Sequence, residues 1–170
     1  MTNAISLLRA QYAQSFGWLE GTMDGVTDEL ANFNPPGAPM PIAGLVAHIV
    51  TGVDFFVLHF ARGDAPLLLS SHADSSGVSE PPPQGAWEEW GNRVQVDLPV
   101  FHEYAKAVFA SVDEYLSTLS DDDLSKEVDM GPFGTQTLEW IFNIMILNTY
   151  SHTGEISCIK GMQGLKGYPM

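Results

Sequence analysis

Hydrophobic positions recur every three or four residues in four long segments of the chain, which is the spacing of amphipathic helices. In the first segment these positions are Ile5, Leu8, Tyr12, Phe16 and Leu19. The pattern predicts helices over residues 3–23, 41–62, 87–119 and 137–164. Stretches rich in proline, glycine, serine or aspartate separate them, and no segment alternates as a strand would. The sequence therefore predicts a single all-α domain built as a four-helix bundle.

The predicted helix boundaries rest on particular residues. Pro41 suits the first turn of the second helix, and Thr137 suits the N-cap of the last one. Pro99 lies inside the predicted third helix, where it would kink the helix or restart it.

The apolar stripe of the last predicted helix is interrupted by polar residues. The stripe consists of Ile141, Met145, Asn148, His152, Ile156 and Ile159. Glu155 follows His152 by three residues, so all three polar side chains are expected on the inward face. An unpaired buried polar group costs about 1–3 kcal/mol, so a partner is expected in the interior. His48 lies on the apolar stripe of the second helix, between Leu45 and Gly52, and is the candidate partner.

Charge and cysteine content narrow the functional classes. The chain carries 21 acidic and 7 basic residues, a formal charge of −14, which argues against nucleic acid and anionic membranes as partners. Its single cysteine, Cys158, excludes an intrachain disulfide and fits a reducing compartment. We expect neither a secretory signal nor a membrane span, since the apolar run Ile141–Leu147 is far shorter than the ~20 residues that a span needs. A cytoplasmic protein is expected.

Two stretches of this sequence resemble the DinB/YfiT-like superfamily of metalloenzymes. They are GWLEGTMDGVTDELANFNPPGAPMPIAGLVAHIV and LSDDDLSKEV, the latter continued by GPFGTQTLEWIFNIMILNTYSHTGEIS. The resemblance implies a four-helix bundle, often a homodimer. It also implies a divalent metal held by a histidine of the second helix and an H-x-x-x-H pair of the last helix. The implied ligands here are His48 and His152, but position 148, where the pair should begin, is Asn148.

Two interpretations of this departure remain open. In the first, His48, Asn148 and His152 bind nickel or zinc, and Glu155 carries protons, binds the metal or orients a ligand. Some relatives use low-molecular-weight thiols, so the resemblance implies a thiol-dependent transferase or isomerase, or a hydrolase. His102, beside the apolar stripe of the third helix, is an alternative third ligand. In the second, the site is degenerate, Asn148 hydrogen-bonds a histidine, and a non-catalytic dimer binds a small ligand or a protein partner.

Overall fold

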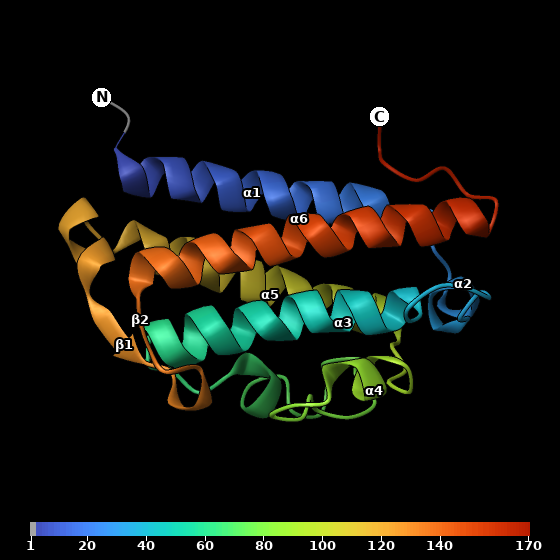
Figure 1. Ribbon diagram of the computed structural model, residues 1–170, viewed down its shortest axis with the longest axis horizontal. Helices are drawn as coiled ribbons and strands as arrows, with labels where there is room; N and C mark the ends of the chain where they lie inside the picture. Colours follow the sequence, from blue (N-terminus) through green and yellow to red (C-terminus); the bar gives the residue numbers. More distant parts are fainter. Residues whose placement is uncertain (1–2) are drawn as a thin grey trace.

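The computed structural model describes residues 3–170 and confirms that the chain is mainly helical. Four long helical segments lie side by side along the longest axis of the molecule (Figure 1). They are α1 (Ala4–Met23), α3 (Ile42–Val53) continued by the π-helix η1 (Asp54–Ala61), α5 (Leu98–Ser117) and α6 (Leu138–Met162). Helix α6 packs against both α1 and α3, and α5 packs against α1. Two short helices, α2 (Asp28–Asn32) and α4 (Trp87–Gly91), lie in the connections.

The helix starts follow from the capping residues. The Asn3 side chain accepts a hydrogen bond from the Ser6 backbone N–H at the start of α1. Thr137 does the same for α6 by accepting from the Trp140 N–H, as the sequence predicted. These bonds satisfy backbone donors that the first helical turn leaves without an intrahelical partner.

The predicted helix over residues 87–119 restarts at Pro99, one of the two outcomes that the sequence indicated. It is two helices, α4 and α5, separated by an irregular segment over residues 92–97. Asp97 ends that segment by capping α5 through the Val100 N–H, and Pro99 occupies the first turn. A proline is tolerated there because its missing N–H would have had no intrahelical acceptor.

The expectation that the chain has no strand is wrong. Strand β1 (Glu127–Asp129) pairs antiparallel with β2 (Thr135–Thr137) just before α6. Gly131 and Gly134 turn the chain with φ of 58° and 71°, the left-handed region that glycine adopts without a steric penalty. The short 3₁₀ segment η4 (Gly131–Phe133) forms the tip of this hairpin and carries Phe133. Two further 3₁₀ segments are η2 (Leu67–Leu69) and η3 (Asp121–Ser125).

Helix α3 is the most deeply buried element among the described residues. Every residue of Ile42–Val53 is buried except His48. The continuous segment Ile42–Ala61 is long and apolar enough to cross a membrane, a feature that the sequence analysis did not identify. However, 78% of its most apolar window is buried inside the protein, so its hydropathy is that of a core helix.

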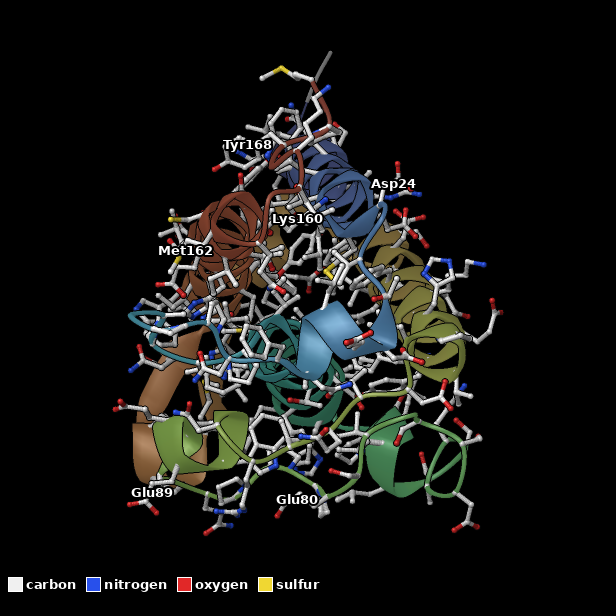
Figure 2. All side chains as sticks on the ribbon, turned by 90° about the vertical axis from the view of Figure 1, so that its right-hand side faces the viewer. Asp24, Glu80, Glu89, Lys160, Met162 and Tyr168 are labelled. Carbon is white, nitrogen blue, oxygen red and sulfur yellow. The ribbon has the colours of Figure 1, made fainter. Side chains whose placement is uncertain are left out.

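Buried polar contacts join the elements around this core. Near one end, the buried Lys160 of α6 donates hydrogen bonds to the backbone carbonyls of Thr22 and Asp24, which ties α6 to the end of α1 (Figure 2). Within the segment Ile42–Ala61, at the junction of α3 and η1, the carboxylate of Asp54 accepts from the Leu67 and Leu68 N–H groups, each at 2.9 Å. It also accepts from the Tyr104 hydroxyl of α5 at 2.8 Å. These bonds hold η1 in place.

The contact between α3 and α4 generates a stability prediction. A Cβ on Gly44 would collide with the Gly91 carbonyl oxygen and would lie 2.9 Å from the Gly91 Cα. Gly44→Ala should therefore lower the free energy of unfolding by about 2–3 kcal/mol, measured by urea denaturation. The control is Gly17→Ala in α1, where a Cβ meets nothing within 4 Å. It should raise stability by about 0.5–1 kcal/mol, because alanine has the higher helix propensity. Equal effects of the two substitutions would contradict the close packing of α4 on α3.

Candidate metal centre between helices α3 and α6

The structure brings His48 of α3 together with Asn148 and His152 of α6. The two imidazole rings lie 4.9 Å apart between centroids, with an interplanar angle of 89°. The Asn148 Nδ2 lies 3.3 Å from the His48 Nε2. All three side chains are only partly buried, at the line where α3 and α6 meet. The candidate residues therefore form a cluster in space, and metal binding by that cluster stays a prediction.

The hydrogen bonds of this cluster cannot all be satisfied from within it. The His48 Nδ1 and the Asn148 Oδ1 are both buried and have no hydrogen-bond partner. Rotating the Asn148 amide would let its oxygen accept from the Nε2–H of His48, but would then leave the amide N–H groups without an acceptor. A divalent ion binds an imidazole nitrogen at about 2.0–2.1 Å, closer than the ~2.9 Å of a hydrogen-bonded water. The crowded cluster thus offers donor atoms suited to an ion.

Glu155 holds the second histidine in one orientation. Its Oε2 lies 2.7 Å from the Nδ1 of His152. When Nδ1 donates its proton to the carboxylate, the lone pair of the neutral ring lies on Nε2, the nitrogen left free to bind a ligand. Glu155 itself does not lie on the inward face, contrary to the sequence-based expectation, and its side chain is 45% exposed. A shift of three residues turns it about 60° from His152, to the edge of the stripe next to the buried Ile156.

His48 is held in its neutral form. Burial and, to a smaller extent, the neighbouring His152 lower the pKa of His48 from 6.5 to about 4, while Glu155 acts in the opposite direction. A histidine must be neutral to donate a nitrogen lone pair to a metal. The environment that makes His48 difficult to protonate therefore keeps it ready as a ligand.

The donor set is nevertheless small. Among residues 3–170, no three histidine, cysteine, aspartate or glutamate side chains are grouped closely enough to hold an ion. A metal here would rest on two imidazoles and the amide oxygen of Asn148, which is a weaker donor than an imidazole. Such a set fits a divalent ion that keeps open coordination positions, as catalytic sites do.

The other histidines lie elsewhere. His102 is exposed on α5 and lines a cavity of about 640 Å³ between α1, α3 and α5. Val46 and Val50 form the α3 wall of that cavity, on the side of α3 away from His48. His102 therefore does not complete the cluster. His59 is exposed in η1, and its Nδ1 pairs with the Asp64 carbonyl oxygen at 2.9 Å.

A smaller cavity adjoins the histidine cluster, and sequence reasoning missed it. It measures about 270 Å³. Its walls include His48, Phe56, Trp87, Phe133, Trp140 and Asn148. The Trp87 ring meets the His48 ring edge-on, with centroids 5.0 Å apart. These aromatic residues come from four separate segments, and their gathering leaves no periodic signal in the sequence.

The fold and the cluster define a class of protein: a helical domain whose polar site is built from side chains on two facing helices. The DinB superfamily model matches residues 11–156, and the chain belongs to the DinB superfamily. A crystal structure of a conserved protein from Enterococcus faecalis is similar to this chain with a TM-score of 0.79. The two are 19% identical, and the similarity covers 94% of this chain and 96% of the other, which shows a shared fold. A comparison with curated proteins found no match.

The state of His48 predicts how stability depends on pH. In the metal-free protein its folded pKa of about 4 lies below the unfolded value of 6.5. Its contribution is therefore complete above pH 6.5 and is lost as the pH falls toward 4, by about 3 kcal/mol in total. Urea denaturation between pH 7 and pH 4 would measure it. His48→Gln should flatten this part of the profile, and an unchanged slope in the variant would contradict the burial of a neutral imidazole.

Proposed function

We propose that the protein is a divalent-metal-dependent enzyme whose site is held by His48, Asn148 and His152. The observation that carries the proposal is the pair of facing imidazoles, 4.9 Å apart, next to two buried polar atoms that have no partner in the chain. Nickel or zinc is the proposed ion, because imidazole suits both. Membership of the DinB superfamily, which is often associated with metals, supports the same assignment.

The residues of the cluster have separate roles in this proposal. His48 and His152 supply nitrogen lone pairs, and Glu155 fixes the ring of His152 through Nδ1. A divalent ion, when bound, would lower the pKa of a water or a thiol that it binds. Because Glu155 touches His152 and is also exposed, it can pass a proton between the site and solvent. The proposed chemistry is a thiol-dependent transfer or isomerisation, or a hydrolysis, acting on a small molecule.

A second candidate function is a metal-free bundle that binds a ligand or a protein partner without catalysis. It is favoured by one observation, the contact between the Asn148 amide and the His48 ring at 3.3 Å. That contact occupies Nε2, one of the two ring nitrogens of His48. The metal titration described below separates the two candidates.

We also assign the four long helices to the four-helix bundle of this superfamily, and infer a cytoplasmic homodimer that binds neither nucleic acid nor membranes. The net charge of −14 supports the absence of nucleic-acid and membrane binding, because both surfaces are anionic. Large apolar side chains that remain exposed on α1 and α6, Leu7 and Leu147 among them, support a dimer interface. Light scattering at micromolar concentration measures the molar mass and so distinguishes a dimer from a monomer.

The role of Asn148 predicts the result of a metal titration. Asn148→His replaces the weak oxygen donor by an imidazole and should tighten nickel or zinc binding on the order of tenfold or more. His48→Ala and His152→Ala should weaken binding in either background. Calorimetric titration of the natural protein and the three variants measures this, and metal should raise the melting temperature of the tighter binder more. If neither the natural protein nor Asn148→His binds an ion, the metal-dependent proposal is wrong and the second candidate stands.

The contact of Glu155 with His152 predicts a separate effect. Glu155→Gln removes the charge that orients the ring and should weaken metal binding by about tenfold. The matched control is Glu139→Gln, an exposed glutamate in the first turn of the same helix, which removes the same charge. Calorimetry on both variants tests the role of Glu155. An equal loss in the control would mean that only the net charge matters.

A further inference from the structure

The cavity beside His48 continues into a second one. The second cavity, of about 140 Å³, shares Phe56, Trp87 and Phe133 with the first. We call the two together the aromatic cleft. Aromatic and proline side chains of three segments form most of the wall of the second cavity: Phe56 and Phe60 of η1, Pro83 and Trp87 around the start of α4, and Pro132 and Phe133 at the hairpin tip. The uncharged polar positions in this wall are His59 and Gln84.

The aromatic cleft lacks charged side chains. Of the described residues that line it, none is aspartate, glutamate, lysine or arginine, although the chain has 21 acidic residues. By contrast, Glu20, Asp24 and Asp28 line the larger cavity on the other side of α3. Glu80 and Glu89, in the segment that covers the cleft, lie at the outer surface of the molecule (Figure 2). A charged ligand would lose its hydration in the cleft without gaining an opposite charge, which is unfavourable.

The walls of the aromatic cleft favour a flat apolar ligand. Phe56 and Phe133 meet at a tilt of 54° with centroids 5.0 Å apart, although they lie far apart in the sequence. Phe133 and Trp140 are 42% and 39% exposed, so their rings still face solvent. A flat ring placed against them would remove apolar surface from water and make the tilted or offset contacts that aromatic rings prefer.

The inner end of the aromatic cleft is polar. His48 and Asn148 line it there, and each has one buried polar atom without a partner. A ligand with one hydroxyl, thiol or carbonyl group at its inner end would face these two side chains. The modest volumes of the two cavities suit one or two fused rings, since pockets for drug-sized ligands measure about 300–1,000 Å³.

We infer that the substrate of the proposed enzyme is a neutral, flat-ring molecule with a single polar group directed at His48 and Asn148. Calling this ligand a substrate rests on the proposed function. Its chemical class rests on the residues that line the aromatic cleft. The class excludes anionic and cationic small molecules as the ligand that fills the cleft.

The charge preference is tested with three naphthalene probes of similar size: neutral 2-naphthol, anionic 2-naphthoate and cationic 2-naphthylmethylammonium. Calorimetry at pH 7 on the full chain, dialysed against a chelator so that the carboxylate has no ion to bind, measures their affinities. We expect saturable binding of one 2-naphthol per chain, roughly tenfold or more tighter than either charged probe. Absence of binding, or equal or tighter binding of a charged probe, overturns the inference.

The location of the ligand in the aromatic cleft is tested by substituting two exposed phenylalanines, one in the cleft and one outside it. Phe133→Ala removes one wall of the aromatic cleft and should weaken 2-naphthol binding by about tenfold. The control Phe33→Ala removes a ring that is 53% exposed and does not line the cleft, so affinity should be unchanged. Melting curves establish that both variants fold. Unchanged affinity in Phe133→Ala overturns the inference.

Failure of this inference can be distinguished from failure of the proposed function. Metal binding that His48→Ala abolishes, together with no binding of 2-naphthol, overturns the ligand class and leaves the metal-dependent function intact. Binding of 2-naphthol that Phe133→Ala weakens, without binding of nickel or zinc, upholds the ligand class and overturns the metal-dependent function.

Discussion

The burial of α3 is the constraint on which the rest of the structure depends. Because Ile42–Val53 is apolar almost all round, it must be covered on every side, and α2, α4, α5 and α6 all pack against it. The short α4 can approach closely only because Gly44 and Gly91 have no side chains at the contact. The same approach brings Trp87 against His48, the one residue of α3 that is not buried. The packing of α4 on α3 therefore both covers the core and places Trp87 at the site.

The sequence could predict whatever is encoded locally or in helical spacing. The apolar stripes located the long helices, Thr137 marked the start of α6, and the polar interruptions of the stripes identified His48, Asn148 and His152, which the fold brings together. The sequence indicated a kink or restart at Pro99, but it did not predict that α4 ends at Gly91. It also missed the three-residue strands. Such short elements are stabilised by tertiary contacts and have too few residues to show a period. The aromatic cleft was missed for a related reason: its walls join segments distant in the chain.

Asn148 has a larger consequence than the loss of one imidazole. A buried polar atom without a partner costs about 1–3 kcal/mol, and this cluster contains two in the ligand-free chain. A site that had only lost its function could remove this cost by replacing the polar residues with apolar ones, as the neighbouring positions Met145 and Ile156 show is compatible with the fold. The retained polar atoms are better explained by a ligand that contacts them, whether an ion, a polar group of a substrate, or both.

The distribution of charge connects the candidate metal with the neutral ligand class. His48 is held neutral, and the carboxylate of Glu155 is held against His152. A divalent ion there would retain most of its positive charge in a poorly hydrated place, and would strongly favour the loss of a proton from a nearby hydroxyl or thiol. A neutral molecule can enter the uncharged aromatic cleft without a desolvation penalty for a charge and become anionic only at its inner end. Glu155, which touches both His152 and solvent, is placed to take up the released proton. The uncharged cleft, together with the carboxylate of Glu155 held against His152, thus suits a substrate that is ionised after it binds.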